Sequence, residues 1–205
     1  MRCTVVGAGV SGLTCAVKLL EAGHEVEVVS DKFSPDTVSD VAAAIWYPFL
    51  TAPANRSEPW GISTYSVLQG LARDESESGV VMRDGREYLR EVVALPAWRD
   101  DIASFRVLEA NEIVQGYVFG WEFRAPVIEM HRYMPWLRSK VESMGGSFRQ
   151  SFVSDLSEVP GEVVVNCVGL GAQELCGDDE IQPARGQVIF LDQDPGIGYF
   201  DQQPE

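Results

Sequence analysis

The sequence has few of the residues that build metal sites and disulfide frameworks. It contains only two histidines, His24 and His131, and its four cysteines form no C-x-x-C pair. Cys3, Cys15 and Cys167 fall in apolar runs, where a free thiol behaves as a small hydrophobic group. We therefore predict no metal site and no redox site, with the cysteines reduced.

Positive charge and long apolar runs are also scarce. The 16 Lys and Arg residues face 31 Asp and Glu residues, which gives a formal net charge of −15 over 205 residues. This excess would repel nucleic acid and anionic membranes, so neither partner is expected. No apolar run reaches the ~20 residues that a membrane-spanning helix requires, and the apolar residues after Met1 lead into a glycine loop rather than a signal-peptide cleavage site. We therefore expect a cytoplasmic protein.

The first 31 residues have the pattern of a strand, a helix and a second strand. Residues 2–6 (RCTVV) are typical of a buried strand, and residues 24–30 (HEVEVVS) alternate as a second strand would. Between them, SGLTCAVKLLEAG repeats apolar residues at helical spacing, and Gly23 fits the position after a helix C-terminus. Such a β-α-β unit requires parallel strands with a right-handed crossover.

The loop between the first strand and the helix carries the motif G-x-G-x-x-G at Gly7, Gly9 and Gly12. Gly7 permits a tight turn, Gly9 lets a pyrophosphate approach the backbone, and Gly12 lets the helix pack close to the strand. The helix N-terminus then offers free N–H groups and partial positive charge to the phosphates. The motif predicts a dinucleotide site but does not distinguish NAD from FAD.

An acidic residue ends the second strand, where a dinucleotide fold places the ribose ligand. Asp31 occupies that position and can accept hydrogen bonds from both ribose hydroxyls. Glu25 and Glu27 compete for this role, but they fall in mid-strand, as a solvated strand edge would. We predict that Asp31 binds the adenosine ribose.

The rest of the chain divides into an inserted lobe and a return to the first domain. Residues 51–128 have a strand-and-loop pattern, with Asp84-Gly85 as a hairpin-turn signal. A helix over 131–146 and three strands, within 147–153, 162–171 and 186–192, follow, and Val163–Val165 is typical of a buried central parallel strand. We therefore predict a discontinuous nucleotide domain of residues 1–50 and 130–192, an inserted substrate lobe at 51–129 and a connecting tail at 193–205.

A run of small residues follows the first β-α-β unit. Residues 39–48 (SDVAAAIWYP) place three alanines before Trp46, Tyr47 and Pro48. In an extended segment, such small side chains would let a flat ring system lie against the backbone. A buried packing segment would have the same residue types, so the run alone leaves both interpretations open.

Together these segments make the sequence resemble the D-amino-acid oxidase family, within the FAD-dependent amine oxidases, and its bacterial members more than its animal ones. The resemblance covers nearly the whole chain and rests on VVGAGVSGLT, SDVAAAIWYPFL, GWEFRAPVIEMHRYMPWL, VVVNCVGLGA and PARGQVI. The first of these is shared with every Rossmann protein, whereas the second and the last two are specific to the family or its near relatives. The resemblance implies an α/β fold: a Rossmann-like FAD-binding domain, a parallel sheet with helices, plus an inserted mainly β substrate lobe, incomplete at the C-terminus.

The resemblance also implies the contacts of the FAD cofactor. The pyrophosphate would lie on the glycine loop and the flavin ring against the small-residue run, while Ile45 and Tyr47 would line the substrate pocket. At Val168 the family often has a threonine, so only a backbone contact remains there. The implied cofactor-binding residues are Gly7, Ala8, Gly9, Val10, Ser11, Gly12, Asp31, Lys32, Thr37, Val38, Ser39, Ala43, Ala44, Ile45, Val153 and Val168.

The implied activity is oxidative deamination of D-amino acids by oxygen, to 2-oxo acids, ammonia and hydrogen peroxide. A substrate carboxylate beside a flavin needs a bidentate arginine, and neither Arg124 nor Arg185 matches the arginine that the family uses. No catalytic residue is therefore assigned, and we expect a C-terminal segment of the same enzyme to supply the missing part. A homo-oligomer stays open.

Two other functions remain. The chain could be a non-catalytic dinucleotide-binding fragment of a truncated flavoprotein. An NAD-dependent dehydrogenase is the weaker alternative, because the inserted lobe has no plausible catalytic constellation of histidine or lysine.

Overall fold

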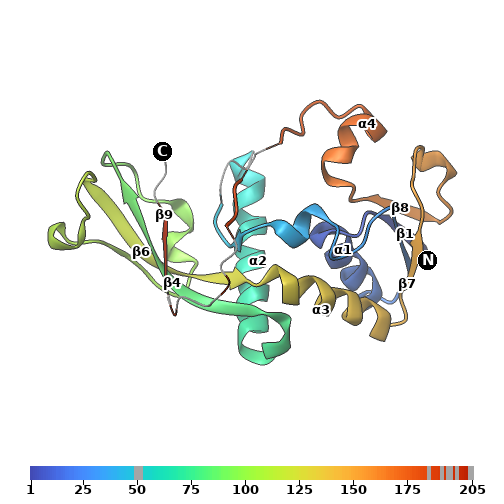
Figure 1. Ribbon diagram of the computed structural model, residues 1–205, viewed down its shortest axis with the longest axis horizontal. Coiled ribbons are helices and arrows are strands. Elements are labelled where there is room, and N and C mark those ends of the chain that lie inside the picture. Colours follow the sequence, from blue (N-terminus) through green and yellow to red (C-terminus); the bar gives the residue numbers. More distant parts are fainter. Residues whose placement is uncertain (49–52, 184–185, 190–191, 193–195, 197–198, 203–205) are drawn as a thin grey trace. The chain divides into compact units, whose positions relative to one another are not determined.

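The computed structural model describes the chain except for residues 49–52, 184–185, 190–191, 193–195, 197–198 and 203–205 (Figure 1). The chain forms two compact units: unit 1 is Met1–Ala43 with Glu129–Val188, and unit 2 is Ala44–Ile128 with Ile189–Glu205. The predicted boundary at residue 50 falls inside unit 2, because Ala44 and Ile45 already pair with a strand of that unit.

Unit 1 contains a sheet whose described strands are all parallel, in the order β7-β2-β1-β8. Its central side chains, Val5, Val28 and Val29, are fully buried, as expected for strands covered on both faces. The α/β fold with a parallel sheet is thereby confirmed (Figure 1). The strands are β1 (Arg2–Val6), β2 (Glu25–Ser30), β7 (Ser147–Gln150) and β8 (Val163–Asn166).

Two long helices of unit 1 pack against each other, α1 (Val10–Glu21) and α3 (Met130–Ser143). α1 buries Leu13, Ala16 and Val17, the apolar face that the sequence spacing predicted. At its end, Gly23 has φ +79° and donates its N–H to the carbonyl of Leu20, while the next N–H bonds the carbonyl of Leu19. This pair of bonds stops the helix at a glycine, because only glycine takes a left-handed conformation without cost.

β8 is not the buried central strand that its valine run predicted. Among the described strands it pairs only with β1, and Val163 is 37% exposed. β1 lies between β2 and β8 and has the fully buried side chains instead. Three consecutive valines favour a strand, but they do not fix its place in the sheet. Unit 1 also contains α4 (Ala172–Cys176), η1 (Val38–Val41), η5 (Leu156–Glu158) and η6 (Gly169–Gly171).

Unit 2 is built on a long antiparallel pair, β4 (Val80–Leu89) and β6 (Phe119–Ile128), in register over ten residues. β3 (Ala44–Ile45) and β5 (Phe105–Val107) pair with β6. Edge-to-face aromatic rings fill its core: the centroids of Trp46 and Tyr65 lie 5.0 Å apart, and those of Trp46 and Trp98 lie 5.6 Å apart. The unit further contains η2 (Ser76–Ser78), η3 (Ala97–Asp100) and η4 (Ala110–Glu112).

The strand-and-loop prediction for residues 51–128 is wrong at its start, where α2 (Ala54–Asp74) is a helix of 21 residues. Pro59, Gly61 and Gly70 in this segment all weaken a helix locally, which concealed it in the sequence. Packing within the unit compensates: Tyr65 is 2% exposed and donates its hydroxyl to the carbonyl of Arg124 at 3.0 Å.

The hairpin turn predicted at Asp84-Gly85 is also wrong, because β4 continues through both residues. Asp84 pairs with Arg124 and Gly85 with Phe123 in the β4–β6 register. A hairpin needs its two flanking runs to pair with each other. Here both runs pair with a strand that comes much later in the chain.

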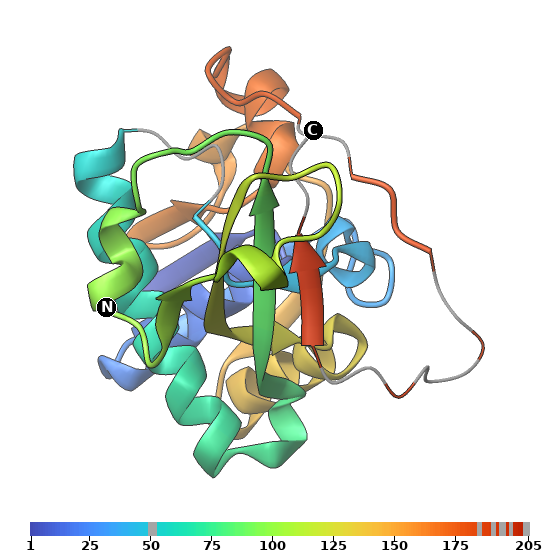
Figure 2. The same cartoon turned by 90° about the vertical axis from the view of Figure 1, so that its left-hand side faces the viewer.

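The predicted connecting tail, residues 193–205, contains a strand. β9 (Tyr199–Gln202) pairs in parallel with β4, and Figure 2 shows it, in red, beside the green β4. The register Asp84↔Tyr199 gives this segment a backbone partner in unit 2. The strand predicted over 186–192 is not formed at residues 186–189, and residues 190–191 lie outside the described part. In the ranges that the structure describes, no helix is long and apolar enough to cross a membrane.

Candidate cofactor site

A cavity of about 700 Å³ opens in unit 1 at the carboxyl ends of β1 and β2. This is the edge at which open parallel sheets bind ligands. The glycine loop forms one part of its wall, and the segments after β2, β7 and β8 form the rest. Of the predicted residues, the cavity is lined by Gly7, Ala8, Gly9, Val10, Ser11, Asp31, Lys32, Thr37, Val38, Ser39, Val153 and Val168.

Backbone contacts explain two of the three glycines. Gly7 has φ +105°, and a Cβ at this position would lie 2.3 Å from the carbonyl oxygen of Cys167. A Cβ on Gly12 would lie 1.9 Å from the carbonyl oxygen of Gly7. Both distances are far below contact, so the loop closes against the strand and the helix only because these side chains are absent. Gly12 lies behind the loop and does not line the cavity.

The third glycine faces a hydroxyl from the segment after β2. A Cβ on Gly9 would lie 3.0 Å from Oγ of Ser39, and this Oγ accepts the N–H of Val10 at 3.0 Å. The first amide of α1 is therefore held by a side chain that also lines the cavity. Phosphate oxygens bind backbone amides at the start of a helix, so a phosphate here would replace Ser39 Oγ on this amide or bind the amide next to it.

The turn that carries Ser39 is fixed by an acid that the sequence reasoning missed. Asp40 accepts three hydrogen bonds, from the backbone N–H of Thr37 at 3.0 Å, from the Thr37 hydroxyl at 2.5 Å and from the Ser34 hydroxyl at 2.5 Å. The pattern T-x-x-D at 37–40 is a capping signal that could have shown this in advance.

Asp31 directly follows β2, and its side chain is exposed and lines the cavity. Its backbone carbonyl accepts a hydrogen bond from Gln150 at 3.1 Å, which ties the segment to β7. Glu25 and Glu27 do not line the cavity, and Glu27 instead pairs with Arg149 at 3.2 Å. The position of Asp31 fits the role of a ribose ligand.

Several cavity residues were not singled out from the sequence. Most belong to the segment after β8, where a short 3-10 turn and the start of α4 complete the wall. A hydrophobic strand gives no signal of what its following loop will face, so pattern reasoning stops at the strand end. The missed residues are Val6, Ser30, Asp36, Ser151, Phe152, Ser154, Cys167, Gly169, Leu170, Gly171, Glu174, Leu175 and Ile181.

Besides Gly12, four more of the predicted residues do not line this cavity. Ala43 closes the first segment of unit 1, and its side chain is exposed. Ala44, Ile45 and Tyr47 belong to unit 2. Their predicted contacts with the flavin ring and the substrate stay predictions.

Tyr47 donates its hydroxyl to Oε2 of Glu87 at 2.6 Å inside unit 2. Glu87 is only 4% exposed. Burial raises the pKa of Glu87, and the hydrogen bond from the Tyr47 hydroxyl opposes this shift only in part. Burial, together with Glu87, also raises the pKa of Tyr47, so the phenol stays protonated at neutral pH. This buried pair was not predicted from the sequence.

We expect Glu87→Gln to change how stability depends on pH. Since the folded state binds the Glu87 proton more tightly than the unfolded state, the free energy of unfolding falls as pH rises from the unfolded pKa through the raised one. Glutamine keeps an acceptor for Tyr47 and does not ionise. Urea unfolding at several pH values between about 5 and 8, all above the ordinary glutamate pKa of about 4.3, should therefore show the variant gaining stability relative to the parent as pH rises.

Glu112→Gln is the matched control for that measurement. The guanidinium of Arg106 lowers the pKa of Glu112 to about 2, so this carboxyl is ionised in both states above its unfolded pKa. Its replacement should shift stability by an amount that does not change with pH in that window. Parallel pH curves for Glu87→Gln and the parent protein would contradict the assignment of a raised pKa to Glu87.

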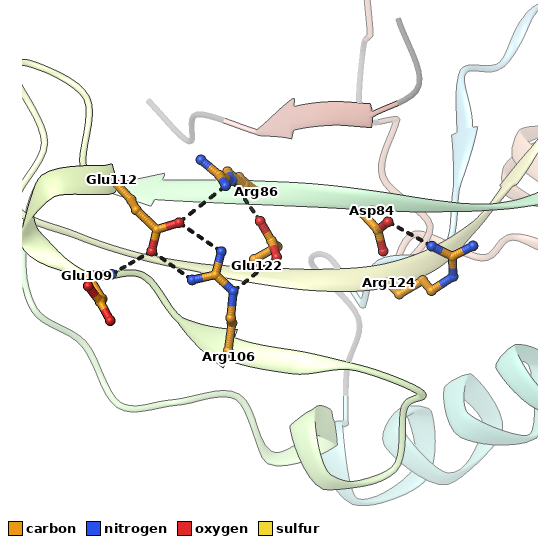
Figure 3. Close-up of polar contacts among 7 residues, drawn as sticks. All are labelled: Asp84, Arg86, Arg106, Glu109, Glu112, Glu122 and Arg124. Carbon is orange, nitrogen blue, oxygen red and sulfur yellow. Dashed lines mark hydrogen bonds and ion pairs between the residues drawn. The ribbon is translucent and has the colours of Figure 1, made fainter.

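Three arginines of the β4–β6 sheet, Arg86, Arg106 and Arg124, are engaged with carboxylates (Figure 3). Arg86 and Arg106 form a four-residue network with Glu112 and Glu122: Arg106 Nη1 lies 2.7 Å from Glu112 Oε2, and Arg86 Nε lies 2.8 Å from Glu122 Oε2. The network uses both oxygens of both carboxylates. Neither arginine is therefore free to bind a further carboxylate without losing these bonds.

Arg124, one of the two arginines considered for the substrate carboxylate, is paired as well. Its Nη1 lies 2.7 Å from Oδ2 of Asp84, and its Nη2 donates to the carbonyl of Met82 at 3.4 Å. Figure 3 shows this pair further along the same two strands. Arg185, the other candidate, lies outside the described residues.

Comparison with known proteins identifies the family of this chain. Residues 2–204 match the family model described as FAD dependent oxidoreductase. The D-amino-acid oxidase of Rubrobacter xylanophilus is 39% identical over 202 residues, which cover 97% of this chain and 61% of that protein. The D-aspartate oxidase of Homo sapiens is 36% identical over 211 residues, covering 97% of this chain and 62% of its own length.

Solved structures show the same fold. The glycine oxidase of Geobacillus kaustophilus matches with a TM-score of 0.69 at 16% identity, covering 86% of this chain and 58% of that one. The chain thus spans about three fifths of the length of the curated relatives that it matches. The glycine cradle and the helix N-terminus fit a dinucleotide, and the family match covers both. The chain therefore belongs to the FAD-dependent oxidoreductase family, and its cofactor is FAD.

Proposed function

We propose that this chain is part of an oxidase that deaminates D-amino acids with oxygen, giving 2-oxo acids, ammonia and hydrogen peroxide. The observation that carries the proposal is the 700 Å³ cavity behind the glycine loop, in a chain that the family model matches over residues 2–204. Two relatives, 39% and 36% identical, are named D-amino-acid oxidase and D-aspartate oxidase. These names support a D-amino acid as the substrate class.

In this proposal unit 1 holds FAD, which when bound takes two electrons from the substrate and passes them to oxygen. The amide of Ser11 at the start of α1 binds the pyrophosphate, and that of Val10 exchanges its bond to Ser39 Oγ for one to a phosphate oxygen. The carboxylate of Asp31 binds the adenosine ribose. Lys32, Val153 and Val168 complete the wall around the adenosine end. Thr37–Ser39 contact the phosphate side, and Ala43–Ile45 lie against the flavin ring.

The substrate carboxylate needs a cation, and three arginines of the unit 2 sheet are already engaged with carboxylates. An unpaired charge buried beside a flavin would be too costly, so an arginine must meet it. Arg86, Arg106 and Arg124 are already paired with Glu112, Glu122 and Asp84. We assign this role to a C-terminal segment of the same enzyme, because no arginine of this chain matches the one that the family resemblance implies. The cytoplasmic location and a homo-oligomer stay predictions.

Residues 1–205 should bind FAD and release no peroxide from D-alanine or D-aspartate by themselves. Flavin fluorescence during titration measures the first property, and a coupled peroxide assay measures the second. Absence of FAD binding would overturn the cofactor assignment. Peroxide release by this chain alone would instead overturn the two-part proposal and return the carboxylate role to Arg124 or Arg185. Turnover that never appears, even with the C-terminal segment added, would favour a non-catalytic fragment.

Asp31→Ala should weaken FAD binding ten- to hundredfold, which corresponds to the roughly 1.5–3 kcal/mol of a hydrogen bond to a charged acceptor. Because the Asp31 side chain is exposed, the free energy of unfolding without FAD should change by less than ~0.5 kcal/mol. Isothermal titration with FAD gives the affinity, and urea unfolding gives the stability.

Glu25→Ala is the control for Asp31, since Glu25 is also an exposed acid of β2 but does not line the cavity. Its FAD affinity should equal that of the parent protein. If Glu25→Ala weakened FAD and Asp31→Ala did not, the ribose role would pass to the mid-strand acids.

A further inference from the structure

Two cysteines that are distant in the sequence meet behind the glycine loop. The thiol of Cys167 donates to Sγ of Cys15, and the two sulfur atoms lie 3.8 Å apart although 152 positions separate the residues. Both side chains are half-buried. A disulfide has a sulfur–sulfur bond of about 2.05 Å, so the two atoms would need to approach by about 1.8 Å.

The surroundings of this pair connect it to the cofactor cavity. Cys15 lies on α1, the helix whose N-terminus forms the glycine loop. Cys167 follows β8, lines the cavity, and donates its N–H to the carbonyl of Val6 at 2.8 Å. Its Cβ lies 3.4 Å from the place that a Cβ on Gly12 would occupy. A bond between the two sulfurs would therefore join α1 to the cavity wall.

We propose that Cys15 and Cys167 form a peroxide-sensitive thiol pair, which closes to an intramolecular disulfide between α1 and the wall of the cofactor cavity. The oxidant is hydrogen peroxide. One thiol attacks peroxide and becomes a sulfenic acid with release of water, and the second thiol then displaces the sulfenic oxygen as a second water. The two sulfurs together lose two electrons and two protons, and peroxide is reduced to two molecules of water.

The environment of Cys167 slows its reaction with peroxide. Burial, together with the neighbouring Cys15, raises the pKa of Cys167 to about 12, so this thiol is protonated at neutral pH and a poor nucleophile. Whichever of the two thiols is oxidised first, the other sulfur lies 3.8 Å away, within reach of the sulfenic acid.

The other two cysteines provide internal controls. Cys3 is fully buried within β1, and Cys176 is exposed and accepts a hydrogen bond from the Asn166 amide at 3.1 Å. If exposure alone decided oxidation, Cys176 would react and would form sulfinic acid or a bond between two molecules. If proximity decides, the product is an internal bond between Cys15 and Cys167.

The test is to treat purified protein, and in parallel its Cys176→Ser variant, with hydrogen peroxide and to map the products by peptide mass spectrometry without reduction. We expect a linked peptide pair containing Cys15 and Cys167, with a loss of two hydrogen atoms that dithiothreitol reverses. Sulfinic or sulfonic acid on Cys15 with a free Cys167 would overturn the proposal. Because peroxide is added from outside, the result does not depend on the proposed oxidase activity.

A second measurement separates a link that fits the native fold from one that forms in unfolded protein. A disulfide closing so long a loop should raise the unfolding temperature of a domain of this size by roughly 5–15 °C. Cys15→Ser in the Cys176→Ser background should show no rise after peroxide. A lower unfolding temperature in the linked protein would show that the native positions do not suit the bond, and would overturn the proposal.

Discussion

We expect Gly12→Ala to lose FAD binding and to unfold far more readily than the parent protein. The added methyl carbon would lie 1.9 Å from the carbonyl oxygen of Gly7 and 3.4 Å from Cβ of Cys167. The first contact is with backbone, which no rotamer change relieves. Overpacking usually lowers the free energy of unfolding by ~1–3 kcal/mol. We expect a loss at the upper end of that range or above, because α1 must move away from β1.

Thermal unfolding and FAD titration of the same samples measure both effects. Gly70→Ala is the control, since a Cβ at this helical glycine meets nothing within 4 Å. There the change should stabilise the protein by about 0.5–1 kcal/mol, because alanine restricts the unfolded chain and favours helix. A Gly12→Ala protein with the stability and FAD affinity of its parent would mean that helix and strand do not pack this closely.

Phe123→Ala should be the most damaging change in unit 2. Phe123 is 1% exposed, and its ring centroid lies 5.4 Å from that of Trp98 and 5.9 Å from that of Tyr47. Removing a buried phenylalanine side chain typically costs 3–5 kcal/mol in proteins, through lost transfer energy and the cavity left behind, so about that loss is expected here. Urea unfolding followed by tryptophan fluorescence measures it.

Trp60→Ala serves as its comparison, because the Trp60 side chain on α2 is 64% exposed. Despite the larger volume removed, its loss should change the free energy of unfolding by about 0.5 kcal/mol or less. Should both variants lose similar stability, the aromatic cluster would not be the core of this unit.

The parts that were predictable from the sequence are those that local rules determine. The strand, glycine loop and helix over residues 2–23 each have a local cause: β-branched residues, a turn that needs glycine, and an apolar face at helical spacing. The position of Asp31 is predictable from the same rules, because the residue after the second strand lies beside the glycine loop. The resemblance to a family identified FAD as the cofactor, whereas the glycine loop by itself does not distinguish FAD from NAD.

The parts that were missed depend on contacts between distant segments. α2 contains Pro59 and two glycines, so its local preference is weak and its packing through Tyr65 stabilises it. Asp84-Gly85 has the composition of a turn, but pairing with Arg124 and Phe123 keeps it extended. The Tyr47–Glu87 pair brings together residues forty positions apart. No local pattern in the sequence signals such a pair.

The parallel pairing of β9 with β4 has a consequence for the time course of synthesis. β4 ends at Leu89, and its partner begins only at Tyr199. At roughly 5–20 residues per second, a ribosome needs about 5–20 s to cover that interval. Throughout this time one edge of β4 has backbone N–H and C=O groups without their final partner, and such edges recruit other strands. The nascent chain is therefore most prone to aggregate in the interval when the β4–β6 pair has formed and residue 199 has not yet emerged.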